Sequence, residues 1–254
     1  MDFIAIIPAR YSSTRFPGKP LANLGGKPIV QHVYERVAQL FEHTYVATDD
    51  ERIAHAIEGF SGRVVMTRSD HRSGTDRCYE AYTRTGLHAD VVVNVQGDEP
   101  FIALSQLEAV KRCFDDGATQ IATLVRPFAA DTPWETLANP NSPKVVVDGN
   151  DCALYFSRSV IPYIRGVAQR EWTSVHTFYK HIGIYAYRAD VLRQLVALPQ
   201  GQLEKAESLE QLRWLQAGFR IKVGYTATET IGIDTPEDLE RAREFWNALS
   251  NQTL

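Results

Sequence analysis

Short apolar runs alternate with segments of helical periodicity through the first half of this chain. After the opening run at residues 3–7, strand-like segments occur at 44–48, 63–66, 90–100 and 120–126. The segment at 90–100 ends in a polar turn. Between them, residues 28–41, 51–58, 75–85 and 104–114 carry apolar side chains at helical spacing. This alternation predicts β-α-β units and an α/β fold with a mostly parallel, doubly wound sheet. Such a sheet binds ligands at the carboxyl ends of its strands.

The alternation breaks between residues 127 and 180, a stretch that contains several prolines and one or two strand-like runs within 152–164. It resumes with a strand at 181–188, a helix from Ala189, a second helix near 208–217 and a strand at 220–225. Thr235 followed by Pro236 predicts the start of a final helix. We therefore expect residues 1–254 to form a single α/β domain, with 127–180 as an insertion that serves an interface or covers a substrate.

Composition excludes several classes of protein. The 254 residues carry a formal net charge of −4, so no general basic field indicates nucleic acid. The three cysteines are widely spaced, which favours free thiols in a reducing compartment. No segment approaches the ~20 consecutive apolar residues that a membrane span requires. We expect a cytoplasmic protein with no membrane insertion.

Positive charge gathers in the loop after the first strand. Arg10, Arg15 and Lys19 occur within ten residues, among serines and glycine. Cations and backbone N–H groups at the end of a strand suit a polyphosphate, and triphosphate is the natural ligand. The loop lacks the Walker A pattern and the G-x-G-x-x-G pattern. The alternative is a solvated surface loop.

Two aspartates are candidate metal ligands. Asp98 lies in the polar turn that ends the strand-like run at 90–100, where a carboxylate could hold Mg²⁺ together with phosphate oxygens. It could instead cap the next turn. Asp234 precedes the final helix, and it is either a second metal ligand or a favourable charge at the helix N-terminus. Spacing alone does not separate these alternatives.

Other polar residues have two interpretations each. Ser73, Gly74 and Thr75 enter a helix, where they could contact a nucleotide or only cap the helix. His181 begins a strand and could be an ordinary satisfied polar side chain. Glu210 and Gln211 lie on an amphipathic helix, where exposure to solvent is the default.

Seven motifs together resemble one family, the 3-deoxy-manno-octulosonate (KDO) cytidylyltransferases, also called CMP-KDO synthetases. In order, they read IIPARYSSTRFPGKPL, TRSDHRSGTDR, VNVQGDEP, ALYFSRSVIPY, HIGIYAYR, LEQLRWLQAG and IDTPEDLERAR, over residues 3–244. The resemblance implies a sandwich fold like that of nucleotide-diphospho-sugar transferases and a homodimer, with 127–180 forming the dimer contact and the sugar cover. It implies that CTP and KDO react, with Mg²⁺, to give CMP-KDO and diphosphate for lipopolysaccharide biosynthesis.

The resemblance also implies roles for individual residues. The catalytic residues would be Arg10, Lys19, Asp98 and Asp234, of which Asp98 and Asp234 would hold the metal. The nucleotide would contact Ala9, Arg10, Ser12, Ser13, Arg15, Lys19, Ser73, Gly74, Thr75 and Gln96. The sugar acid would contact Arg158, Arg165, His181, Tyr185, Glu210 and Gln211. None of these looks like an obligatory general base, since positioning and electrostatics do most of the work in phosphoryl transfer.

Three other functions remain open at this stage. The enzyme could activate another acid sugar, such as a sialic acid or the 8-amino analogue of KDO. A non-catalytic nucleotide-binding module should lack a metal carboxylate or the loop lysine, and this chain has Asp98, Asp234 and Lys19. A glycosyltransferase would more typically carry an isolated D-x-D motif, which neither TDDE at 48–51 nor GDEP provides.

Overall fold

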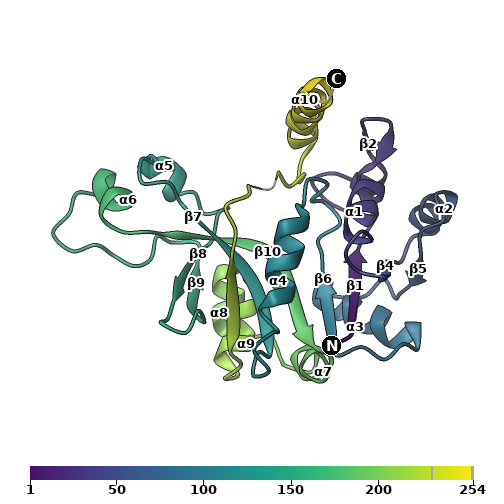
Figure 1. Cartoon of the computed structure of the whole chain (residues 1–254), viewed down its shortest axis with the longest axis horizontal. Coiled ribbons are helices and arrows are strands. Elements are labelled where there is room, and N and C mark those ends of the chain that lie inside the picture. The colour runs from purple at the N-terminus through teal and green to yellow at the C-terminus, as the bar shows by residue number, and fades with distance from the viewer. Residues whose placement is uncertain (230, 253–254) are drawn as a thin grey trace. The chain divides into compact units, whose positions relative to one another are not determined.

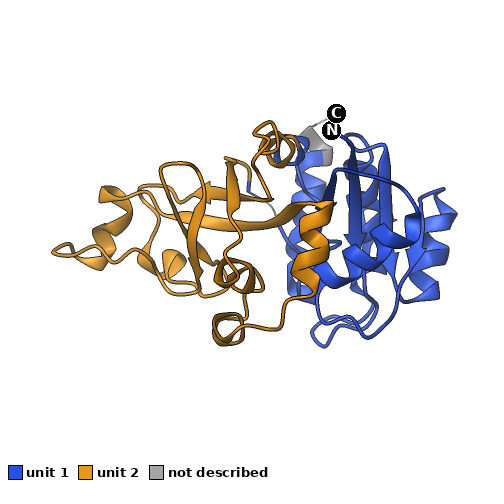
Figure 2. Cartoon of the chain, turned by 90° about the horizontal axis from the view of Figure 1, so that it is seen from below, with its two compact units in different colours: residues 1–107, 229–254 blue, residues 108–228 orange. Residues whose placement is uncertain are grey.

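The computed structural model describes residues 1–229 and 231–252 (Figure 1). The chain divides into two compact units, shown in different colours in Figure 2. Unit 1 comprises residues 1–107 and the C-terminal stretch from 229, and unit 2 comprises residues 108–228. The expectation of one domain with an insertion at 127–180 stays a prediction. Across the described ranges, no helix has both the length and the apolar character of a membrane span.

Unit 1 contains a parallel sheet with helices packed on it. Its strands are β1 (Phe3–Pro8), β2 (Asn23–Leu24), β3 (Lys27–Pro28), β4 (His43–Thr48), β5 (Val64–Met66) and β6 (Val91–Asn94). Its helices are the 3₁₀ turn η1 (Lys19–Leu21), α1 (Ile29–Val37), α2 (Glu51–Gly59), α3 (Gly74–Thr85) and α10 (Pro236–Gln252), and α4 (Leu104–Arg112) begins here and ends in unit 2.

Strands β6, β1, β4 and β5 lie side by side in that order and run parallel. Ile6 in β1 is the register partner of Tyr45 in β4 and of Asn94 in β6. The apolar residues of β1 and β6 are buried, as expected for strands covered on both faces. Because the strands are parallel, the loops that follow β1 and β6 leave the sheet at the same edge.

Side-chain caps mark where the helices α2, α3 and α10 of unit 1 begin. The Asp50 side chain accepts a hydrogen bond from the Arg52 N–H at the start of α2, and Ser73 Oγ accepts one from the Asp76 N–H at the start of α3. Thr235 Oγ1 accepts from the Asp238 N–H (3.3 Å), and α10 begins at Pro236. The predicted start of the final helix is therefore confirmed.

Unit 2 is built on the strands β7 (Ile121–Pro127), β10 (Tyr179–Arg188) and β11 (Ile221–Tyr225). β11 runs parallel to β7, whereas β10 runs antiparallel to it, with a bulge between Ile182 and Tyr185. β10 returns antiparallel because the chain reaches it through the irregular stretch 127–180 and not through a crossover helix. The helices are η2 (Gln169–Glu171), α5 (Trp134–Leu137), α6 (Trp172–Val175), α7 (Ala189–Val196), α8 (Gln202–Glu207) and α9 (Gln211–Gln216).

The stretch 127–180 contains a hairpin that the sequence pattern only half predicted. Strand β9 (Ala153–Ser157) falls within the expected range, but its antiparallel partner β8 (Lys144–Val147) arises from the proline-containing run before it. In the same stretch, Leu137, Trp172 and Phe178 form a separate buried cluster. The proposed use of this stretch for a dimer contact and a sugar cover stays a prediction.

Candidate active site

The loop after β1 lines a pocket of about 430 Å³ in unit 1. Gly18 shapes this loop, because its φ of +72° lies in the left-handed region and its N–H donates to the Tyr11 carbonyl oxygen (2.9 Å). The Arg52 guanidinium stacks on the Tyr11 ring, 3.3 Å from its centroid. The pocket brings together most of the predicted nucleotide residues, namely Ala9, Arg10, Ser12, Ser13, Arg15, Lys19, Gly74 and Gln96, along with Asp98.

The ammonium group of Lys19 joins the two predicted metal ligands. Lys19 Nζ lies 2.6 Å from Asp98 Oδ2 and 3.2 Å from Asp234 Oδ1. Arg15 adds a second cation, with its Nη2 3.2 Å from Asp234 Oδ1. The Lys19 side chain is only 14% exposed, so its charge is held inside the pocket wall. Asp98 and Asp234 therefore converge on one point although 136 positions separate them in the sequence.

The backbone places these two carboxylates. The N–H of Ile233 donates to the carbonyl oxygen of Asp98 (2.9 Å), which sets Asp234 beside the end of β6. A Cβ on Gly97 would lie 2.8 Å from the Pro8 carbonyl oxygen, closer than a methyl group can approach. Glycine at 97 thus lets the chain after β6 pass close to the end of β1.

Two converging carboxylates beside a phosphate-sized pocket are a suitable donor set for Mg²⁺. This ion takes one or two carboxylates in proteins and fills its other positions with phosphate oxygens and water. Among the residues that the structure describes, no group of three or more His, Cys, Asp or Glu side chains is arranged to hold a metal. A site at Asp98 and Asp234 would thus need ligands from the substrate and solvent.

Arg10 lies half-buried at the pocket with a second guanidinium behind it. Burial lowers the pKa of Arg10, and the charge of Arg77 lowers it further, whereas Asp49 and Asp76 oppose the shift. Arg77 is fully buried, donates from Nη1 to Thr67 Oγ1 (2.6 Å) and lies 3.3 Å from Asp49. An arginine keeps its charge despite such a shift, so this edge of the sheet presents positive charge.

The residues at the start of α3 divide between the two interpretations. Ser73 caps the helix, because its Oγ accepts from the Asp76 N–H (3.1 Å). Gly74 lines the pocket, whereas Ser73 and Thr75 are not among its lining residues. Thr75 is buried. The role of Ser73 and Thr75 in nucleotide contact stays a prediction.

Four of the predicted sugar-binding residues lie around β10 and α9 in unit 2. The rings of His181 and Tyr185 are 5.3 Å apart, and His181 Nε2 lies 3.1 Å from Thr123 Oγ1. Gln211 lies in the same α9 helix as Trp214, whose ring packs edge-on against Tyr185 at 5.1 Å. Glu210 precedes this helix, and its charge acts on Tyr185.

Two polar atoms in this region, Gln211 Nε2 and Trp214 Nε1, are buried with no hydrogen-bond partner in the part of the chain that the structure describes. Burial lowers the pKa of His181 to about 4 and raises that of Tyr185 well above its usual value. The two groups are therefore neutral near pH 7. Such unsatisfied groups are costly in a core, and hydroxyl groups of a bound ligand could satisfy them.

The two predicted arginines of the sugar site take no part in the contacts around His181 and Tyr185. Arg158 directs its guanidinium onto three backbone carbonyl oxygens, those of Glu207 (2.6 Å), Pro140 (2.9 Å) and Ser208 (3.2 Å). Arg165 lies exposed in the loop before η2. Neither arginine is grouped with His181 and Tyr185 by any of these contacts, so the assignment of a carboxylate contact to them stays a prediction.

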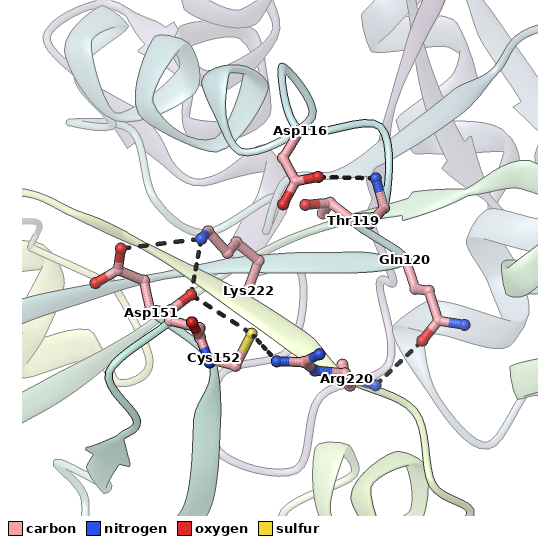
Figure 3. Close-up of a pocket in the computed structure, with 9 residues that line it drawn as sticks. Asp116, Thr119, Gln120, Asp151, Cys152, Arg220 and Lys222 are labelled. Carbon is pink, nitrogen blue, oxygen red and sulfur yellow. Dashed lines mark hydrogen bonds and ion pairs between the residues drawn. The ribbon is translucent and has the colours of Figure 1, made fainter.

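A second pocket of about 370 Å³ lies elsewhere in unit 2 (Figure 3). Lys222 Nζ donates to the Asn150 carbonyl oxygen (2.8 Å), and Arg220 Nη2 lies 3.5 Å from Cys152 Sγ. Figure 3 shows both cations directed at the turn that carries Asp151. No predicted site residue lines this pocket, and its cations fasten the turn after β8 to β11.

Sequence reasoning missed two charges of unit 2, the buried Lys144 and the half-buried Glu207. Lys144 is fully buried in β8, and the Glu207 carboxylate accepts two hydrogen bonds from the end of β9. The signal for Lys144 was a lysine directly before three valines, PKVVV. Glu207 carried no comparable signal.

A parallel α/β sheet with cations and paired carboxylates at the carboxyl ends of its strands defines a nucleotide-binding enzyme. A family model described as cytidylyltransferase matches residues 4–223. A 3-deoxy-manno-octulosonate cytidylyltransferase of Phocaeicola vulgatus is 66% identical over 96% of this chain and 97% of its own length. The enzyme of the same name from Bacteroides thetaiotaomicron is 64% identical over 96% and 98%. The chain belongs to the 3-deoxy-manno-octulosonate cytidylyltransferase family.

Solved structures agree with this assignment. One is a CMP:2-keto-3-deoxy-manno-octonic acid synthetase complexed with CTP, with a TM-score of 0.88 and 44% identity over 100% of both chains. A cytidylyltransferase from Leptospira borgpetersenii has a TM-score of 0.60 and 17% identity over 96% of this chain and 85% of its own. The second likeness concerns the fold alone. The expected α/β fold with a mostly parallel sheet is confirmed.

Proposed function

We propose that this chain is a cytidylyltransferase that activates KDO, converting CTP and KDO into CMP-KDO and diphosphate. The observation that carries the proposal is the convergence of Lys19, Asp98 and Asp234 at the pocket formed by the loop after β1. The relatives that match nearly the whole chain carry this activity in their names.

The pocket in unit 1 supplies what the triphosphate half of the reaction needs. Arg10, Arg15 and Lys19 bind the phosphates and offset the negative charge that develops as diphosphate leaves. Ser12 and Ser13 add hydrogen bonds. Ala9, Gly74 and Gln96 line the same pocket, where they contact the nucleoside together with Ser73 and Thr75.

Asp98 and Asp234 are the residues that would hold Mg²⁺. When bound there, the ion neutralises charge on the triphosphate and lowers the pKa of the attacking hydroxyl group. The carboxylates themselves orient Lys19 and Arg15 through the ion pairs described above. The anomeric hydroxyl of the sugar acid attacks the α-phosphorus in line with the departing diphosphate.

The sugar acid is bound by His181, Tyr185, Glu210 and Gln211, with Arg158 and Arg165 as further candidates. The unpartnered Gln211 Nε2 supports this assignment, because a polyhydroxylated ligand offers oxygen acceptors to it. His181 is neutral near pH 7, so one ring nitrogen can accept a hydrogen bond from a sugar hydroxyl.

A diphosphate-release assay with CTP and a panel of sugar acids tests the proposal. We expect release with KDO and none with N-acetylneuraminic acid, and loss of release when UTP replaces CTP or when divalent ions are chelated. Release with the sialic acid or 8-amino-KDO in preference to KDO would assign the enzyme to another sugar. No release with any of them would indicate a non-catalytic nucleotide-binding module.

Three further properties belong to the same proposal. The enzyme works in the cytoplasm, its product serves lipopolysaccharide biosynthesis, and it acts as a homodimer. Exposed apolar side chains within 127–180 support a dimer contact there, because Leu154, Tyr163 and Val175 are 59%, 74% and 57% exposed. Light scattering on the purified protein, with Tyr163→Ser as the variant, tests the dimer.

A further inference from the structure

Glu207, the last residue of α8, ties that helix to the end of β9. Its carboxylate accepts hydrogen bonds from Ser157 Oγ (2.6 Å) and from the backbone N–H of Arg158 (2.8 Å). Ser157 is buried and Glu207 is half-buried, so the first of these bonds is partly shielded from water. A hydrogen bond to an ionised acceptor is stronger than one between neutral groups.

Arg158 makes the same connection in the opposite direction. Its Nε and Nη2 donate to the carbonyl oxygens of Glu207 and Ser208, which end α8. These carbonyl groups have no partner within the helix, and a cation is favourable beside them. Ser208 has a φ of +49°, a left-handed conformation that a serine adopts only where its surroundings impose it.

Lys144 is the third charged member of this cluster. It is fully buried, and its Nζ donates to the carbonyl oxygens of Asn139 (3.1 Å) and Arg158 (2.8 Å). Glu207 supplies the negative charge that acts on it. A buried ammonium group requires such partners, so removing Glu207 would leave Lys144 beside Arg158 without a counter-charge.

The turn at Glu207 and Ser208, which these contacts hold, comes directly before the proposed sugar-binding residues of α9. Glu210 and Gln211 follow Ser208 by two and three positions, and α9 then carries Trp214 against Tyr185. We propose that Glu207, held by Ser157 and Arg158 and balanced by Lys144, is a positioning residue for the acid-sugar subsite. This inference rests on the proposed function. The inference also explains why Arg158 donates to the carbonyl oxygens of Glu207 and Ser208, since these bonds help to hold the turn after α8.

The test compares Glu207→Ala with Glu207→Gln in steady-state kinetics. We expect Glu207→Ala to raise KM for KDO about ten-fold or more, with KM for CTP unchanged, because the variant disturbs one subsite only. Glu207→Gln should restore only part of the affinity, since its amide oxygen can accept from the Arg158 N–H and its amide nitrogen can donate to Ser157 Oγ, but the charge that balances Lys144 is still missing. Glu171→Gln, at an exposed residue of unit 2, is the matched control. An equal rise in both KM values, or none in either, overturns the inference.

A second measurement does not depend on the substrate. Hydrogen exchange of the amides in 208–216 should be faster in Glu207→Ala than in the wild type, and unchanged elsewhere in α7 and β10. If Glu207→Ala does not fold, Ser157→Ala removes one of the two bonds and should show the same pattern more weakly. Unaltered exchange in 208–216 would refute the positioning role. A wild-type protein that releases no diphosphate with KDO would refute the proposed function instead.

Discussion

The backbone N–H of Ile233 donates to the carbonyl oxygen of Asp98, and this one bond connects the end of β6 to the start of α10. It places Asp234 next to Asp98, with Lys19 between their carboxylates. The chemistry of the pocket therefore depends on a backbone contact between segments far apart in the sequence.

Asp98→Asn should lower kcat by at least about a hundred-fold, the loss expected when one group that stabilises transition-state charge is removed. The asparagine is of similar size, so we expect an unchanged fold by circular dichroism. Diphosphate release at saturating Mg²⁺ is the measurement. Asp70→Asn, at an exposed position, is the control. Wild-type kcat in the Asp98 variant would contradict the metal role.

Gly97→Ala should destabilise unit 1 and disturb the pocket together. The added methyl group would meet the Pro8 carbonyl oxygen at 2.8 Å, and neither backbone can move aside freely. Overpacking of this kind costs about 1–3 kcal/mol. Denaturant unfolding measures the loss. Gly59→Ala is the control, because nothing lies within 4 Å of its added Cβ. If Gly97→Ala unfolds at the denaturant concentration of the wild type or above it, the close approach is not restrictive.

Lys144 should make stability depend on pH in the alkaline range. Burial lowers its pKa to about 8 from the usual 10.5, with Glu207 opposing and Arg158 reinforcing the shift. Between these pH values the unfolded chain binds a proton that the native state does not, so the free energy of unfolding rises with pH from 8 to 10.5. Lys144→Met should reduce this rise. Urea unfolding at several pH values measures it, and an identical slope in both proteins would contradict the assignment.

His181 should contribute in the acidic range with the same sign. Burial lowers its pKa to about 4 from 6.5, so between these pH values the unfolded chain binds a proton that the native state does not bind. The free energy of unfolding therefore falls as the pH falls from 6.5 to 4. His181→Gln should weaken this dependence, whereas His55→Gln, at an exposed histidine, should leave it as in the wild type. Acid titration of urea unfolding decides between these outcomes.

Much of unit 1 could be predicted from the sequence because its signals are local. Continuous apolar runs predicted the strands β1 and β6, and Thr235-Pro236 predicted the start of α10. The grouping of cations after β1 with Asp98 also followed, since carboxyl ends of parallel strands meet at one edge. The position of Asp234 required the family resemblance, because spacing alone left a helix-dipole role equally open.

Unit 2 was harder to predict because its contacts are long-range. The pairing of β8 with β9 depends on tertiary packing that a proline-containing run does not announce. Arg158 has the charge of a carboxylate-binding residue, but the nearby carbonyl oxygens at the end of α8 take up its donors. The sequence shows that residue 158 is an arginine, but it does not show which backbone carbonyl oxygens will accept its hydrogen bonds.

Lys19 gives this protein a built-in counter-ion. Like charges on Asp98 and Asp234 would otherwise push the start of α10 away from β6, and the ammonium group cancels that repulsion before any substrate arrives. Lys19 thus offsets the carboxylate charge by itself, and the Mg²⁺ that we propose would be needed for turnover alone. We therefore expect a chelator to abolish diphosphate release and to leave the melting temperature of the protein unchanged.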